Sequence, residues 1–356
     1  MDAAPALDDP GSVSSEKREA AAAKVTAYAA ANLRQASWSE VGVDIFFVGV
    51  NGVVALFCAA LYYFGAVPPL ATCATLSLSW IAPIFLLNWL VCWTGYAGYD
   101  WMFHRYADLF GAQPTKFNPA PYAPGQLRRE MFYTLLSMGF ASAWEVAVLH
   151  LWATGRGGAA PYERVGAAPL WQFLGTFLLL GLWSDFHFYW VHRLLHTSLL
   201  YNPLGIPVHK LHHMSNNPGP WSGSACALSP AHCFVPARLF STPHLTLLIT
   251  HTHTPSARAR ARAAVSMHPV ESVLYLSKIA GVLLIPAHPL HLLFILFNAT
   301  LMPIPGHSGH LEALGNEYHW IHHHCFSFNY GSPAVPLDKL FGTHFQFAKA
   351  AEKKKE

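Results

Sequence analysis

Long apolar segments alternate with short polar ones through the first half of the chain. Each apolar segment is about 20 residues long, which is enough for a helix to cross a hydrocarbon core of about 30 Å. The four segments are Asp44–Ala66, Thr75–Thr94, Glu130–Ala153 and Pro169–Trp190. We therefore predict four transmembrane helices; buried core helices of a globular protein are the alternative.

A fifth apolar stretch, Val273–Met302, has a different pattern. Pro286, His288 and Pro289 interrupt it in the middle, and each half is too short to span a bilayer alone. We interpret the stretch as a re-entrant helical hairpin whose proline-rich tip is shielded by other helices. A single kinked span is the alternative.

The distribution of basic residues predicts the orientation. Four spans place both termini on one side, and the two short loops on the other side contain only Arg156 and Arg164 as basic residues. The segments predicted on the side of the termini carry Lys17, Arg18, Lys24, Arg34, Arg105, Lys116, Arg128, Arg129, Arg193 and Lys210. By the positive-inside rule, the termini and the histidine clusters described below are expected to be cytosolic.

The pattern also divides the chain into regions. Residues 1–43 form a polar tail and an Ala-rich amphipathic helix, residues 44–124 an N-terminal transmembrane hairpin, and residues 125–344 the main domain. Residues 345–356 form a basic tail ending Lys353-Lys354-Lys355-Glu356, which fits the dilysine pattern for retrieval to the endoplasmic reticulum. A solvated charged tail is the alternative.

Composition supports a membrane protein with a substantial polar part. Of the 356 residues, 53% are hydrophobic and only 12% are charged, about half the usual charged share of a soluble domain. The net charge of +3 gives no sign of a nucleic-acid partner. The six cysteines show no close pairing, so we expect neither a disulfide framework nor a thiolate metal site.

Histidine is the unusual residue, with 22 copies, and eight of them form three clusters. The clusters are His192 and His196; His209, His212 and His213; and His319, His322 and His323. Spacings of three and four bring side chains to one helical face, and imidazole suits iron, zinc, copper and nickel. Eight ligands exceed the needs of one ion, so we predict a two-metal centre. The Glu-x-x-His motif of ferritin-like di-iron bundles does not accompany the clusters, so we do not expect that fold.

Three further residues are candidates for the same site. His307 lies in a Gly-His-Ser-Gly sequence, and His268 lies in a Met-His-Pro-Val-Glu sequence; either could be an additional ligand. Asp185 lies seven residues before His192, on the same helical face. We expect its carboxylate to orient a ligand histidine, since metal-bound imidazoles usually have such a partner.

These motifs together resemble the fatty acid hydroxylase / sterol desaturase superfamily. Asp185-x-x-x-Tyr-Trp-x-His192-Arg-x-x-His196 resembles its first histidine box, and His209-Lys-x-His212-His213 its second. His268-Pro-x-Glu271 and His307-Ser-Gly resemble signatures between the boxes. His319-x-x-His322-His323, followed by Asn329-Tyr-Gly and Asp338-Lys-Leu-Phe-Gly-Thr343, resembles the third box and its tail.

The resemblance implies an all-α, multi-pass oxygenase of the endoplasmic reticulum membrane with a cytosolic, histidine-rich helical cap. Such enzymes hold two iron ions, use O2, and hydroxylate or desaturate a membrane lipid. The electrons come from NAD(P)H through a reductase and usually cytochrome b5. This sequence has neither a dinucleotide fingerprint nor a haem domain, so we expect separate electron-transfer proteins.

A sterol is the leading substrate class, and fatty-acyl or sphingolipid hydroxylation is the rival. A membrane metal transporter and a catalytically inactive scaffold are rivals from other classes. A transporter would need ionisable residues within its spans, and the clusters lie outside them. A scaffold would be expected to lack box histidines, and none is missing.

Residues 224–265 do not fit the pattern of the rest of the chain. They form a low-complexity insert with His-Thr and Ala-Arg repeats. In the superfamily, the motifs on either side of this insert lie much closer together. We interpret the insert as a retained intron or gene-model error; a species-specific loop or a basic lipid-binding patch is the alternative.

Overall fold

The computed structural model describes residues 40–111, 125–213, 267–307 and 316–345, and these contain helices and no strand. The longer helices are α2 (Glu40–Tyr63), α3 (Leu78–His104), α5 (Gln126–Ala153), α6 (Leu170–Leu195), α10 (Pro289–Leu301) and α12 (Asn316–Cys325). The shorter ones are α4 (Tyr106–Phe110), α7 (Ser198–Tyr201), α8 (Lys210–His213), α9 (Pro269–Leu276), α11 (Pro303–Gly306) and α13 (Leu337–Leu340). The 3₁₀ turns are η1 (Leu70–Ala74), η2 (Val165–Ala167), η3 (Pro203–Gly205) and η5 (Ser277–Leu283). The predicted all-α class is therefore confirmed for these residues.

Three helical segments in the described residues are long and apolar enough to cross a membrane: Leu78–Phe103, Gln126–Ala153 and Pro289–Gly306. The predicted count of four spans is not confirmed. The predicted first span overlaps the 24-residue helix α2, within which Asn51–Tyr63 forms an apolar stretch. The fourth corresponds to α6, which is long, but polar residues such as Ser184, Asp185 and His187 lower the hydropathy of its second half.

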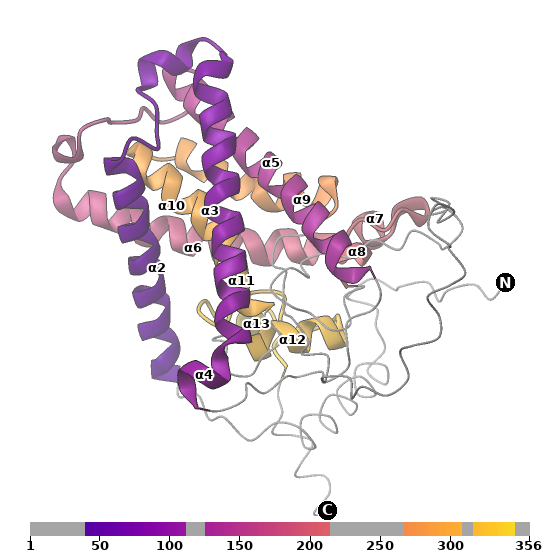
Figure 1. The fold of residues 1–356 in the computed structure, drawn as a ribbon. Helices are drawn as coiled ribbons and strands as arrows, with labels where there is room; N and C mark the ends of the chain where they lie inside the picture. Colours follow the sequence, from indigo (N-terminus) through magenta and orange to yellow (C-terminus); the bar gives the residue numbers. More distant parts are fainter. Residues whose placement is uncertain (1–39, 112–124, 214–266, 308–315, 346–356) are drawn as a thin grey trace, which may run out of the picture.

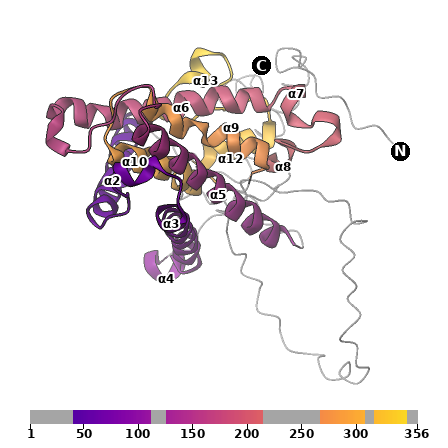
Figure 2. The ribbon, with the colours of Figure 1, turned by 90° about the horizontal axis from the view of Figure 1, so that it is seen from above.

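Helix α10 occupies the centre of the bundle, against α2, α5 and α6 (Figures 1 and 2). Nearly all its side chains are buried. Helix α3 lies farther out, and Leu86, Trp89 and Leu90 are exposed along it. Exposed large apolar side chains on so apolar a helix fit a lipid environment. The chain is therefore a membrane protein by the character of its helices.

The fifth apolar stretch folds back on itself as a hairpin, as predicted. Its second half was expected to be too short to span, but it continues through α11, and Pro289–Gly306 is long and apolar enough to cross a membrane. Helix α9 and η5 form the first limb and α10 the second, and the Tyr275 hydroxyl bridges them by donating to Ala299 O at 3.2 Å. At the tip, Ala159 N donates to Leu283 O at 2.8 Å. The tip therefore meets the loop between α5 and α6, while Met267 and His307, at the ends of the two limbs, line one cavity. This arrangement excludes the single kinked span.

Two histidines satisfy the backbone at the tip of the hairpin. His288 Nδ1 accepts from Leu290 N at 3.1 Å, and His291 Nδ1 accepts from His288 N at 2.9 Å, so the pair forms a capping box for α10. Their other ring nitrogens contact Glu163 O and Phe173 O, both at 3.0 Å. A proline-rich break can therefore be buried without leaving these polar groups unpaired.

Several predictions concern residues outside the described part of the chain. They are the N-terminal tail with its amphipathic helix, the insert at 224–265 and the lysine-rich C-terminal tail. Helix α12, which carries the third histidine cluster, lies with α11 and α13 below α10 in Figure 1.

Candidate metal centre

Nine buried or half-buried histidines form two groups that could each hold a metal ion. The first group is His192, His196, His209, His213 and His322; the second is His212, His307, His319 and His323. Within each group the nearest ring nitrogens all lie within 4.8 Å of one another. All eight cluster histidines are included, and His307 completes the second group.

The two groups do not follow the three sequence clusters. His209 and His213 lie in the first group, whereas His212 lies in the second. Consecutive residues on a helix point about 100° apart, so His212 and His213 face different neighbours. The cluster on α12 is divided in the same way, with His322 in the first group and His319 in the second. Each of these two clusters therefore bridges the two groups.

Carbonyl and carboxylate acceptors outside the first group hold one nitrogen of several rings. His192 Nδ1 donates to Tyr330 O at 2.6 Å, and His322 Nδ1 donates to Phe328 O at 2.7 Å. His209 Nδ1 donates to Glu271 Oε1 at 2.9 Å. Because these acceptors fix the ring proton on Nδ1, the Nε2 atoms carry free lone pairs.

Nε2 atoms within each group lie close together. In the first group, His196 Nε2 lies 3.1 Å from His322 Nε2 and 3.0 Å from His213 Nε2. In the second group, His319 Nε2 lies 2.8 Å from His307 Nε2 and 3.1 Å from His323 Nε2. Lone pairs at such distances repel unless a proton or a cation lies between them. The donor set thus fits a metal ion in each group.

Burial keeps the imidazoles in the neutral form that binds metal. It lowers the pKa of His322 to about 3 and that of His307 to about 4. The pKa values of His209, His213, His319 and His323 are also well below the ordinary value, first through burial and then through repulsion from neighbouring histidines. In addition, His192 Nε2 is buried without a hydrogen-bond partner among the described residues, as an open metal ligand would be.

Two candidates from the sequence lie elsewhere. His268 belongs to neither group: its Nδ1 accepts from Val270 N at 3.3 Å and caps α9. Asp185 does not contact a ligand histidine in the described residues. Its interaction partners are Ser332 and Lys278 in the neighbouring cavity, because residues seven apart on a helix share a face but lie about two turns apart.

Glu271 has the role that the sequence assigned to Asp185. Its carboxylate is buried, contacts His209 and lies on the first turn of α9. The His268-Pro-x-Glu271 motif contains this glutamate, but His268 was the residue of the motif that we expected at the metal site. Burial raises the pKa of Glu271 well above the ordinary value.

Asp338 was also missed as a structural residue of the site. Its carboxylate accepts from Tyr330 N at 2.9 Å and Gly331 N at 2.7 Å, and from the hydroxyls of Tyr318 and Thr343. It thus fixes the loop whose carbonyls orient His192 and His322. A side chain at Gly331 would place a Cβ 3.0 Å from that carboxylate and 3.3 Å from the Tyr189 ring, so a larger residue here would press on both.

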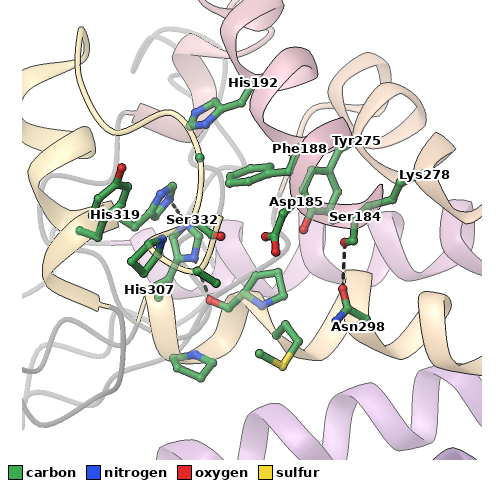
Figure 3. Close-up of a pocket in the computed structure, with 18 of the residues that line it drawn as sticks. Ser184, Asp185, Phe188, His192, Tyr275, Lys278, Asn298, His307, His319 and Ser332 are labelled. Atoms are coloured by element: carbon green, nitrogen blue, oxygen red, sulfur yellow. Dashed lines mark hydrogen bonds between the residues drawn. The ribbon is translucent and has the colours of Figure 1, made fainter. Parts of the chain in front are cut away.

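A cavity of about 190 Å³ lies beside the histidines. Figure 3 shows His192, His307 and His319 at its edge, with Phe188 and Asp185 projecting from α6. Phe188, Met302 and Tyr275 contribute to a wall that is mainly apolar. A lipid-like molecule could therefore lie next to both groups.

Comparisons with known proteins give consistent relatives. The chain is 25% identical over 232 residues to lathosterol oxidase of Homo sapiens, covering 62% of each chain. It is 27% identical over 227 residues to Delta(7)-sterol 5(6)-desaturase erg3C of Aspergillus fumigatus, covering 63% of this chain and 64% of the relative. The chain is therefore similar to sterol desaturases over about three fifths of its length. The resemblance found in the sequence is confirmed.

The similarity has a defined extent. A probable Delta(7)-sterol 5(6)-desaturase of Neurospora crassa is 26% identical over 195 residues, which cover 53% of this chain and 44% of the relative. The chain thus spans less than two thirds of the length of these curated relatives. No family model and no solved structure matches the chain.

Proposed function

We propose that this protein oxidises a membrane sterol at a ring C–H bond. The observation that carries the proposal is the pair of buried histidine groups beside an apolar cavity, in a relative of sterol desaturases. The activities for which the relatives are named favour a sterol over the fatty-acyl or sphingolipid alternative. They also favour desaturation, since two of the relatives above are named as 5(6)-desaturases.

Iron is the metal that we propose for both groups. The ligands would be His192, His196, His209, His213 and His322 for one ion, and His212, His307, His319 and His323 for the other. Iron held by imidazoles would supply O2 activation and the oxidising power to remove hydrogen from an unactivated C–H bond. We infer that NAD(P)H supplies electrons through cytochrome b5 and its reductase.

The protein's own residues would position the reactants. The acceptors on Nδ1 of His192 and His322 keep these rings aimed inward without rearrangement during turnover. Phe188, Tyr275 and Met302 would pack against the rings of the sterol and exclude water from the reaction. An active site joined to lipid-facing helices would receive its substrate without transfer through water.

We also propose a location. The membrane would be that of the endoplasmic reticulum, with the termini and the histidine groups in the cytosol. The basic residues near the predicted spans and the lysines at positions 353–355 support this orientation.

Sterol analysis in yeast tests the proposed function. A strain lacking its sterol C5 desaturase accumulates the unprocessed sterol, and expression of the full chain should restore the 5(6)-unsaturated product. His322→Ala should abolish the restoration at equal expression. New hydroxylated fatty acids or sphingolipids with an unchanged sterol profile would replace the proposal with its rival.

A further inference from the structure

The polar side chains in the cavity wall differ in how many of their hydrogen-bonding groups already have partners in the protein. Ser184 Oγ donates to Asn298 Oδ1 at 2.8 Å, and Asn298 Nδ2 donates to Asn51 Oδ1 at 2.8 Å, so these three form a chain of their own. Glu271 Oε1 accepts from His209 Nδ1, whereas Glu271 Oε2 is buried without a hydrogen-bond partner among the described residues. Lys278 Nζ lies 4.0 Å from the centroid of the Tyr275 ring, in a cation–π contact.

Asp185 and Ser332 have hydrogen-bonding capacity left over. Figure 3 shows the Asp185 carboxylate turned into the cavity, with Ser332 beside it. The Ser332 hydroxyl interacts with the Asp185 carboxylate, but it is buried and forms no hydrogen bond of standard length and angle among the described residues. A carboxylate offers about four acceptor sites, and Lys278 is the positive charge near it.

An acceptor and a hydroxyl side by side in an apolar cavity suit one kind of ligand group. We propose that Asp185 and Ser332 bind a hydroxyl of the substrate, which donates to the Asp185 carboxylate and accepts from Ser332 Oγ. A ligand hydroxyl that enters a buried site must keep both kinds of hydrogen bond to avoid a desolvation cost. The ligand is therefore an apolar molecule with a single hydroxyl at one end.

The spacing along α6 limits the distance from the bound hydroxyl to the oxidised carbon. Asp185 lies seven residues before His192, which corresponds to about 10 Å along the helix. The hydroxyl and the reacting C–H bond must both fit within that length. In a sterol the hydroxyl is on carbon 3, separated from carbon 5 by one ring carbon, so a sterol satisfies the limit. A fatty acyl chain oxidised far from its polar end does not.

This inference rests on the proposed sterol function and is tested by binding rather than turnover. Purified full-length protein, loaded with zinc to prevent reaction, is titrated with a 3-hydroxysterol and with the same sterol lacking the hydroxyl. We expect the wild type to bind the hydroxysterol ~10- to 100-fold more tightly, the range expected for a hydrogen bond to a charged group. Asp185→Asn and Ser332→Ala should each reduce this preference several-fold, with affinity for the deoxy sterol unchanged.

The matched control is Asp108→Asn, which makes the same chemical change at an exposed carboxylate paired with Arg105. It should keep the wild-type preference. If Asp185→Asn does not fold, as judged by its zinc content, the Ser332→Ala result decides alone. A preference for the hydroxysterol that survives both variants overturns the inference and leaves the sterol function standing. Failure of the wild type to bind either sterol overturns the proposed function itself.

Discussion

At the scale of single residues, the groups around the histidines matter as much as the histidines. Tyr330 O, Phe328 O and Glu271 each hold one Nδ1, and this decides that the Nε2 atoms face inward. The two carbonyls belong to one loop, and Asp338 holds that loop by accepting from Tyr330 N and Gly331 N. The same carboxylate also accepts from the hydroxyls of Tyr318 and Thr343. A residue that would touch no metal thus controls the shape of the first group.

Asp338→Ala should therefore weaken metal binding. The substitution leaves the buried N–H groups of Tyr330 and Gly331 without an acceptor, at a cost of about 2–5 kcal/mol in the free energy of unfolding. Thermal unfolding and metal content of the purified variant measure both effects. Asp338→Asn, which keeps one acceptor oxygen, should be affected less. Unchanged metal content in Asp338→Ala would show that the loop does not orient the ligands.

Acid should destabilise the metal-free protein. The folded pKa values of His322 and His307 are about 3 and about 4, whereas an unfolded histidine has a pKa near 6.5. As the pH falls below about 6.5, the unfolded state takes up protons that the folded state excludes, so stability decreases. Each such histidine lowers the free energy of unfolding by up to about 1.4 kcal/mol per pH unit. Denaturant unfolding at pH 7.5, 6 and 5 measures the trend; equal stability at all three would contradict it.

At the scale of elements, the hairpin connects the membrane region to the histidine groups. Its first limb begins at Glu271's helix and its second ends just before His307, so both limbs position site residues. The tip is fixed on the opposite side by His288 and His291, which contact Glu163 O and Phe173 O. The hairpin therefore sets the separation between the tip and the site.

His291→Leu should loosen the tip. Leucine cannot accept from His288 N or donate to Phe173 O, so we expect a loss of about 1–3 kcal/mol in unfolding free energy. Metal content at low temperature should remain, because the histidine groups lie at the other end of the limbs. The control is Leu284→Ala at an exposed tip position, expected to be near wild type. Equal melting temperatures for both variants would refute the capping role.

The sequence predicted the elements better than the contacts between them. Helical spacing places His209 and His213 on one face, and proline placement locates the hairpin break. Spacing alone could not assign His212 and His213 to different groups, because that depends on how α8 is rotated against α12. Nor could it choose Glu271 over Asp185 as a histidine partner, since α9 and α8 are separated by a long stretch of chain.

At the scale of the whole molecule, the insert at 224–265 interrupts the link between the second histidine cluster and the hairpin. His213 precedes it and Met267 follows it, and both lie in the described site region. Closing a longer loop costs little additional entropy, about 0.6 kcal/mol for each doubling of length. The chain that includes the insert can therefore still fold.

Deleting residues 224–265 should therefore preserve or improve activity. The deletion removes the apolar run Leu245–Ile249, which could pack wrongly against the rest of the protein. It also removes the arginine repeat, which would bind anionic lipid headgroups. The two chains are compared in the yeast sterol assay at matched expression, with His251→Ala as a control that should change little. Loss of activity on deletion, with turnover by the full chain, would make the insert a functional element.

The most direct test of the two-metal centre is metal content per chain. Protein purified after expression with iron should contain about two metal atoms per chain by elemental analysis. His322→Ala, in the first group, and His323→Ala, in the second, should each retain about one, with the helical content of the wild type. A wild-type value that stays near one or zero in folded protein would contradict the account, whichever lipid the protein binds.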